Sequence, residues 1–519
     1  MIPAFNLLDE PWLPVRFTDG RLSDVGLLEL FRHSGQIGSL AETSPPSLIA
    51  CYRLLLAITH LALTRAQGSW KDRDRARWYR EGLPEIAMRD YLEHWRERFW
   101  LFHPECPFMQ VAALATAEET RDKCKPWTQI ALASGSGNTP VVFDHAFDDV
   151  PENIAAGLAL RTLLGFLQFT PGGLVKSVRD SDKAGPLANT AAVVPIGSTL
   201  GETLCLSLHP ASIAVEDLPA WECPAPLLGD LSAGPTLAKG ANDRYTRLTR
   251  AVLFVPGDNG DVKWIRFAAG LALGDDVNAP DPMASYRAGN NTLVRLTFSE
   301  GRAFWRDLPA LIPDAEGKAS KPASVLGYSA NLHAELGTLH AEQPVLIAGV
   351  ASDQAKLLRW RSEQIALPAI FLKDASLGVY LREELARAEN VYSQIRSISV
   401  AMYAATMPDP NHKDTRSRAR EIVDHGPAAS AFFSELERNV PKMMALISEG
   451  HSEEAFQNWS ERLVQAANQA WHVLARNLGQ SALAFRAEAK AYFRFRGFLR
   501  TLQSTTPVSP STVLSMEEA

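Results

Sequence analysis

The chain has 519 residues, 46% hydrophobic and 21% charged, an ordinary globular composition that excludes wholesale disorder, collagen and a coiled-coil rod. Its 52 basic and 59 acidic residues give a formal net charge of −7, which excludes a polybasic coat, so any nucleic-acid contact must come from local patches. The five cysteines form no Cys-x-x-Cys pair, which argues against a zinc cluster and a disulfide framework. The start of the chain lacks the features of a signal peptide, and the apolar run Leu48–Leu63 is short for a membrane span. The sequence predicts a cytoplasmic protein with no membrane contact.

The first 375 residues mix helix and strand patterns. Asp19-Gly20 predicts a hairpin over Trp12–Leu27, and an apolar run predicts a buried helix over Leu48–Thr64. Strands are expected at Thr203–Leu208, Ala251–Val255, Lys263–Phe267 and Leu293–Phe298. Stretches without clear periodicity are expected to be long loops that face partners, namely 113–150, 170–200, 229–244 and 316–330.

After residue 375 the pattern becomes helical. Helices are predicted over 377–404, 427–448, 453–478 and 480–503, with a polar connection at Pro408–Arg420. Short connections elsewhere favour antiparallel packing into a four-helix bundle. We therefore predict an α+β fold, in which a large mixed N-terminal domain with long loops (1–375) precedes an all-α four-helix bundle (376–506) and a flexible tail (507–519).

The last predicted helix carries basic residues at four-residue spacing, Arg486, Lys490 and Arg494. Such a stripe is typical of a solvated helix face. It also suits a surface that faces nucleic-acid phosphates, and both interpretations stay open.

A search for catalytic motifs finds little. The run Gly172-Gly-Leu-Val-Lys-Ser177 has the residue types of a phosphate-binding loop in the wrong order. The two His-x-Glu units at His333 and His340 are interpreted as surface histidines beside solvated glutamates, with a metal pair as the alternative. We predict no catalytic residues, no metal and no cofactor.

Several short stretches, taken together and in order, resemble one known family. They are Asn6–Val15, Pro107-Phe-Met-Gln110, Ser136–His145, Gln168-Phe-Thr-Pro-Gly-Gly173, Asp281-Pro-Met283, Trp305-Arg-Asp307 and Asp353-Gln-Ala-Lys356. Each is weak alone, but seven in order, followed by a helical tail, form a specific pattern. The chain resembles the CasA family, the large subunit of the type I-E CRISPR Cascade surveillance complex.

The resemblance implies a non-catalytic recognition subunit. In that family, guide RNA pairing reads the target sequence. The large subunit reads the protospacer-adjacent motif (PAM) in double-stranded DNA, helps open the duplex for R-loop formation and recruits a helicase-nuclease. The implied partners are the CRISPR guide RNA, target DNA, other Cascade subunits and the helicase-nuclease effector.

The resemblance also implies DNA-contacting residues. Gly172 and Gly173, with Lys176 close behind, match the family's glycine loop, where the missing Cβ lets backbone approach bases and phosphates. An ordinary turn after a helix is the alternative. A lysine on a middle strand contacts the PAM in some relatives, and Lys263 is the nearest candidate here.

Gln354 matches the family's glutamine wedge, a hairpin tip that splits the duplex beneath the PAM. Asp353 stands where some relatives have asparagine, and Lys356 could offset its charge. The alternative for this stretch is a solvated turn that leads into a helix over Lys356–Gln364.

Asn138 and Phe143 fall in the family's first flexible loop. The resemblance implies contact with the guide RNA or with neighbouring subunits, since an exposed aromatic can stack on a base or fill a groove on a protein.

Two rival functions stay open on the sequence. The first is a metal-dependent nuclease or hydrolase with an accessory helical bundle, which requires clustered carboxylates or histidines. The second is a purely structural scaffold subunit that touches no DNA.

Overall fold

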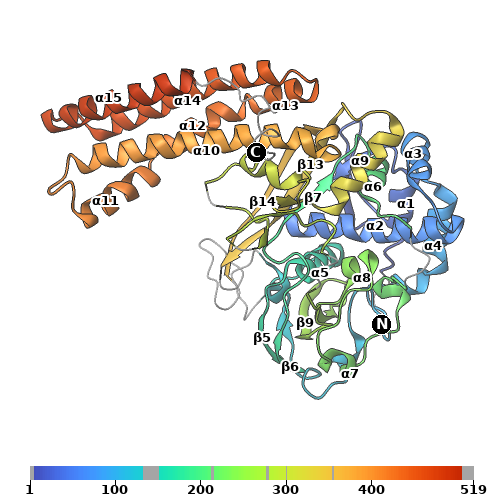
Figure 1. The fold of residues 1–519 in the computed structure, drawn as a ribbon. Coiled ribbons are helices and arrows are strands. Elements are labelled where there is room, and N and C mark those ends of the chain that lie inside the picture. The colour runs from blue at the N-terminus through green and yellow to red at the C-terminus, as the bar shows by residue number, and fades with distance from the viewer. Residues whose placement is uncertain are drawn as a thin grey trace. The chain divides into compact units, whose positions relative to one another are not determined.

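The computed structural model describes residues 5–132, 151–211, 216–275, 280–290, 292–299, 301–353 and 356–504. The fold is α+β, and Figure 1 shows its elements along the chain. The chain divides into two compact units, which we call unit 1 (residues 1–299 and 317–373) and unit 2 (residues 300–316 and 374–519).

Unit 1 combines helices with several small sheets. Its helices are α1 (Leu27–Arg32), α2 (Pro45–Gln67), α3 (Asp72–Glu81), α4 (Glu85–His94), α5 (Ala156–Phe169), α6 (Leu200–Ser207), α7 (Leu228–Ser232), α8 (Ala241–Thr246) and α9 (Ser324–Leu336). Three-stranded sheets have the orders β2-β1-β3, β11-β10-β12, β14-β13-β7 and β4-β9-β8, and β5 pairs with β6.

The strands of these sheets are short except for one long hairpin. They are β1 (Leu13–Phe17), β2 (Leu22–Val25), β3 (Ile37–Leu40), β4 (Lys125–Pro126), β5 (Gly173–Ser177), β6 (Arg179–Asp182), β7 (Ala191–Pro195), β8 (Arg250–Pro256), β9 (Val262–Ala269), β10 (Tyr286–Ala288), β11 (Leu293–Arg295), β12 (Ser320–Lys321), β13 (Glu342–Asp353) and β14 (Lys356–Pro368). All pairings between them are antiparallel.

Helix α2 forms the centre of unit 1. Pro45 and Pro46 begin it, and Gly68, in the left-handed region at φ +72°, follows its end. Nearly every residue from Pro45 to Leu63 is buried. Its length and apolar composition would also suit a membrane span, yet 89% of its most apolar window is buried inside the protein, as in a core helix.

The structure confirms several predictions for unit 1. The predicted N-terminal hairpin is β1–β2, with Gly20 at φ +91° in its turn. The buried helix is α2, and the strands at Ala251–Val255 and Lys263–Phe267 are β8 and β9. Two other expectations are met only in part. The strand expected at Leu293–Phe298 is shorter, because β11 ends at Arg295, and the stretches expected to be loops include β5, β6, β7 and the start of α9.

Two segments of unit 1 have a different secondary structure from the one predicted. Thr203–Leu208 lies largely in helix α6, where the Thr199 side chain accepts a hydrogen bond from the Glu202 amide (3.2 Å) and caps the helix. Burial on almost every side removes the polar face that would have revealed a helical period. The helix considered over Lys356–Gln364 is strand β14, paired along its whole length with β13.

Unit 2 is helical. It contains α10 (Ala375–Ala404), α11 (Lys413–Asp424), α12 (Ala428–Glu437), α13 (Val440–Ser448), α14 (Ser452–Leu478) and α15 (Ala482–Ser504), preceded by a 3₁₀ helix over Phe304–Leu311. The expected helix over 427–448 is broken into α12 and α13, because Pro441 begins a new helix. The expected polar connection at Pro408–Arg420 contains most of α11.

Aromatic side chains fill the core of unit 2. The Trp471 ring stacks on Phe495 with centroids 4.5 Å apart, which joins α14 to α15. The Phe432 and Phe433 rings pack against each other and against Tyr392 of α10. The helix predicted over 453–478 is α14, with Trp459, Leu463 and Leu474 among its buried residues.

Candidate nucleic-acid interface

The glycine pair of the family motif opens the β5–β6 hairpin at the end of α5. A Cβ on Gly172 would lie 3.2 Å from the Ala184 amide nitrogen, tighter than ordinary contacts. Gly173 has φ +155° and nothing within 4 Å of the Cβ position. A side chain at Gly172 would therefore require a small shift of Ala184, while Gly173 presents open backbone to solvent.

A buried charge network holds this hairpin in place. The Asp182 carboxylate, fully buried, accepts from Arg179 (2.7 Å) and from the Gly270 amide (2.8 Å), and lies 3.2 Å from Arg250. The Arg250 guanidinium donates to the carbonyls of Pro171 (2.7 Å) and Lys183 (2.8 Å), on the two arms of the hairpin. Burial lowers the pKa of Arg250, and Asp182 acts against that lowering.

Sequence reasoning misses Asp182, Arg179 and Arg250 as positioning residues. Arg179 and Asp182 are three residues apart, but the other partners are far away in the chain, with about 70 residues between Asp182 and Arg250. The one local signal is an arginine directly before the apolar strand Ala251–Val255, a position where a solvated charge is also common.

The strand that carries the lysine candidate packs against the glycine hairpin. Strand β5 packs against β9, the strand that carries Lys263, which is half-buried. Lys176 lies on β5, and the structure describes its backbone but not its side chain. The fold thus brings the glycine pair, the Lys176 position and Lys263 to neighbouring strands.

The wedge candidate belongs to the β13–β14 hairpin. Asp353 pairs with Lys356, so Gln354 lies between the two strands, outside the described residues. The side chains of Asp353 and Lys356 are also outside the described part. Figure 1 shows this hairpin projecting from unit 1 on the side where β5 lies.

The base of the long hairpin is fixed by contacts to other elements of unit 1. Strand β13 also pairs with β7, and a Cβ on Gly349 would lie 2.1 Å from the Thr190 carbonyl oxygen. His333 of α9 contacts Gln343 (2.8 Å) and Thr338 (2.8 Å). His333 is buried, so its interpretation as a surface histidine is wrong.

The predicted basic face lies in unit 2. Arg486, Lys490 and Arg494 are exposed on α15 and form no ion pair within the described part of the chain. Phe493, between the two last basic positions, is 84% exposed. An exposed aromatic beside unpaired cations is a surface that can stack on bases and attract phosphates.

Asn138 and Phe143 fall in 133–150, outside the described residues. The structure therefore gives no position for the first-loop candidates.

The other motifs of the resemblance hold the fold together. Gln110 donates to the Leu101 carbonyl (2.8 Å) and accepts from the Phe254 amide (2.8 Å), joining its loop to β8. Asp281 forms a fully buried ion pair with Arg53 of α2 (2.8 Å). Asp307 pairs with Arg302 within unit 2 (3.1 Å).

No group of three or more histidine, cysteine or carboxylate side chains that could hold a metal occurs among the residues that the structure describes. The His333 and His340 units do not form such a group. The buried histidine pair His60 and His209 stacks at 3.7 Å between centroids, and burial lowers the pKa of both rings, that of His60 to about 4.

Comparisons with known proteins show which family this chain resembles. A model for CRISPR-associated protein Cse1 matches residues 6–470. The CRISPR-associated protein CasA/Cse1 of Thermus thermophilus is 33% identical over 514 residues, covering 96% of this chain and 98% of that protein. A crystal structure of Thermus thermophilus CasA matches with a TM-score of 0.82 at 29% identity, over 96% of this chain and 100% of that one.

A more distant likeness shows that the fold is shared further. A chain of a CRISPR RNA-guided surveillance complex is 22% identical and matches with a TM-score of 0.72, over 96% of this chain and 99% of that chain. The family model and the Thermus relative both span nearly the whole sequence. The chain therefore belongs to the CRISPR-associated protein Cse1 family.

Proposed function

We propose that this chain is the large, non-catalytic subunit of an RNA-guided DNA surveillance complex. In this role it recognises the PAM in double-stranded DNA, helps open the duplex for guide RNA pairing and recruits a helicase-nuclease. Its partners are then the guide RNA, the target duplex, the other subunits and that effector. Membership of the Cse1 family supports the assignment, as does the likeness to a chain of a surveillance complex.

The observation that carries the proposal is the anchored glycine hairpin. Gly173 has open space where a side chain would stand, and Asp182 and Arg250 fix the backbone on both sides of it. A preorganised backbone can approach a base-pair edge without first losing conformational entropy. Readout in the minor groove is degenerate, so close approach and shape suit the recognition of a short, permissive motif.

The same proposal assigns the β13–β14 hairpin to strand separation. Gln354 at its end acts as the wedge, with Asp353 and Lys356 beside it. A planar amide can stack on an exposed base pair and still hydrogen-bond to base edges. Unstacking costs a few kcal/mol per step, so the wedge must act together with contacts elsewhere, such as those of the glycine hairpin.

The proposal is tested by a gel shift on guide-loaded complex, assembled with and without this chain. Target duplexes differ only in the three bases next to the protospacer. We expect PAM-dependent binding only when the chain is present. Binding that ignores these bases with the chain in place would refute the recognition role and leave the scaffold function.

Substitutions separate the two hairpins. Gly173→Ala strains the backbone at the proposed contact and should weaken PAM-dependent binding roughly tenfold. Gly20→Ala is the matched control, because Gly20 also has positive φ and open space but lies in the β1–β2 turn. Equal binding by the two variants would remove the glycine pair from the interface.

Gln354→Ala should slow duplex opening and leave assembly of the complex intact. Opening is followed by the fluorescence of 2-aminopurine placed in the first base pairs of the target. Gln364→Ala serves as control, since Gln364 lies on β14 of the same hairpin, away from its end. Unchanged opening by Gln354→Ala would contradict the wedge assignment.

The non-catalytic assignment has its own test. The purified chain, incubated with DNA and Mg²⁺ or Mn²⁺, should leave the DNA intact. Metal-dependent cleavage that copurifies with the chain would instead favour the nuclease alternative.

A further inference from the structure

Unit 1 contains a cavity of about 610 Å³ that the proposed function does not use. It lies among three segments that are distant in the sequence: 183–188 after β6, 273–275 after β9, and the small sheet β11-β10-β12. This volume falls within the range of about 300–1,000 Å³ that is typical of sites for small organic ligands.

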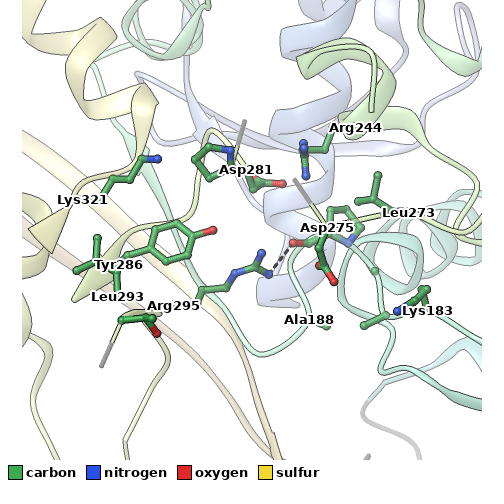
Figure 2. Close-up of a pocket in the computed structure, with 16 residues that line it drawn as sticks. Lys183, Ala188, Arg244, Leu273, Asp275, Asp281, Tyr286, Leu293, Arg295 and Lys321 are labelled. Atoms are coloured by element: carbon green, nitrogen blue, oxygen red, sulfur yellow. Dashed lines mark hydrogen bonds between the residues drawn. The ribbon is translucent and has the colours of Figure 1, made fainter. Parts of the chain in front are cut away.

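The lining of the cavity is positively charged. It includes four basic residues and two acidic ones, namely Lys183, Arg244, Arg295 and Lys321 against Asp275 and Asp281. Figure 2 shows Lys321, Tyr286 and Arg295 on one side, Lys183 and Asp275 on the opposite side, and Arg244 near Asp281 between them. A cationic cavity in a chain of net charge −7 is a local arrangement that attracts anions.

The negative charge of Asp281 is already compensated. Its carboxylate accepts two hydrogen bonds from Arg53 (2.8 and 3.2 Å) and one from the Met283 amide (3.0 Å). Arg244, only 7% exposed, also lowers the pKa of Asp281, after Arg53. The positive charges of Lys183 and Lys321, both exposed at the edge of the cavity, thus remain available to a ligand.

One part of the lining is flat and apolar. Tyr286 is half-buried, and the Arg295 guanidinium lies 6.0 Å from its ring centroid. Arg295 also donates to the Pro186 carbonyl (3.0 Å) and the Thr190 hydroxyl (3.3 Å), which fixes its side chain. Pro186, Leu273 and Leu293 are further apolar residues in the lining of the cavity.

We propose that this cavity binds a single nucleotide, with its base against the Tyr286 ring and its phosphate at Arg295, while Lys321 and Lys183 add positive charge from the two sides of the cavity. A ring that can stack and a cluster of cations are the two features that nucleotide recognition combines. Asp275 forms no ion pair among the described residues. A carboxylate there suits a sugar hydroxyl, which donates a hydrogen bond, and disfavours a bare phosphate.

The nucleotide can be free or can be the end of a strand, and the experiment distinguishes the two. The full chain, without other subunits, is titrated calorimetrically with the four ribonucleoside 5′-monophosphates, inorganic phosphate, uncharged nucleosides and a 5′-phosphorylated tetranucleotide. We expect at least one monophosphate to bind at least tenfold more tightly than inorganic phosphate or its nucleoside. If the tetranucleotide binds with similar affinity, the ligand is the end of a strand. If the tetranucleotide does not bind, the ligand is a free nucleotide.

Variants connect binding to the cavity. The double variant Lys183→Gln and Lys321→Gln should weaken nucleotide binding at least tenfold, and Tyr286→Leu should reduce discrimination between bases. The double variant Lys123→Gln and Lys239→Gln is the control, since both lysines are exposed in unit 1 and neither lines the cavity. Thermal unfolding of each variant establishes that it is folded.

Three results would overturn the proposal. They are an absence of binding by any nucleotide at millimolar concentration, equal affinity for nucleotide and inorganic phosphate, and equal weakening by the cavity and control variants.

Discussion

Units 1 and 2 are stabilised by different kinds of contact. Unit 1 buries charges deep in its interior: Arg53 pairs with Asp281, both side chains at 0% exposure, and Arg75 donates to the carbonyls of Leu208 and Tyr328. Unit 2 has aromatic rings in its core, and its ion pairs are more exposed than Arg53 with Asp281. They include Arg387 with Glu384, at 16% and 13% exposure, and Arg396 with Asp424, at 38% and 37%. Irregular segments need specific polar partners for their backbone, whereas helices satisfy their own and need only an apolar face.

The largest expected effect tests this contrast directly. Asp281→Ala leaves Arg53 buried without its partner and should lower the free energy of unfolding by about 3–5 kcal/mol. Asp424→Ala removes a pair with side chains 37% and 38% exposed and should cost at most about 1 kcal/mol. Urea unfolding of the full chain, followed by circular dichroism, measures both. Equal losses of unfolding free energy would mean that the buried ion pair of unit 1 stabilises the fold no more than the surface pair of unit 2.

The second prediction concerns acid sensitivity in unit 1. His60 is buried against His209, and its pKa of about 4 lies below the value of 6.5 for an exposed histidine. The unfolded state therefore holds more protons between these values, and stability falls as the pH is lowered through that window, by about 3 kcal/mol for this group. His60→Gln should give a shallower decline as the pH is lowered through the same window. An unchanged slope would contradict the assignment.

Unit 2 contains a group whose shifted pKa makes stability change with pH in the opposite direction. Burial raises the pKa of Glu384 from 4.5 to about 7, although Arg387 lies 3.0 Å away and acts against this. The folded state then holds the proton between these two values, so stability is full at low pH and declines as the pH rises, on the order of 1–3 kcal/mol. Glu384→Gln should flatten this decline. A variant that kept the wild-type decline would exclude Glu384 as its source.

The smallest expected effect concerns DNA binding by unit 2. Charge reversal at Lys490 and Arg494 should weaken the binding of target duplex by the guide-loaded complex a few-fold. The slope of the logarithm of the binding constant against the logarithm of salt concentration should fall by the amount expected for about one or two lost phosphate contacts. The control reverses Arg416 and Arg420 on α11, which have the same spacing and are also exposed. Affinity and salt slope equal to the control would make the α15 stripe an ordinary solvated face.

The contrast between the units also explains what can be predicted from sequence. The boundaries of α10, α14 and α15 follow from periodicity within about two residues. Helix α11 escapes prediction because only Ala419 and Val423 among its side chains are buried, so it shows little apolar period. The Pro441 break, by contrast, carries a local signal that predicts the end of a helix.

The candidate interface is predictable only in part. The motifs locate Gly172 and Gly173, because glycine allows backbone conformations and close approaches that other residues do not. They do not show that Gln110 and Asp281 hold the fold, since hydrogen-bond partners across long sequence separations are set by tertiary packing. Asp182 and Arg250 escape prediction for the same reason.

Arg250 holds the β5–β6 hairpin by donating to the main-chain carbonyls of Pro171 and Lys183. These two hydrogen bonds do not involve the side chains of the residues between Pro171 and Lys183. Apart from Gly172 and Arg179, the segment from Gly172 to Ser181 can thus vary in sequence while these two main-chain contacts stay the same. The way in which this hairpin is attached is therefore separable from the sequence that it presents to solvent.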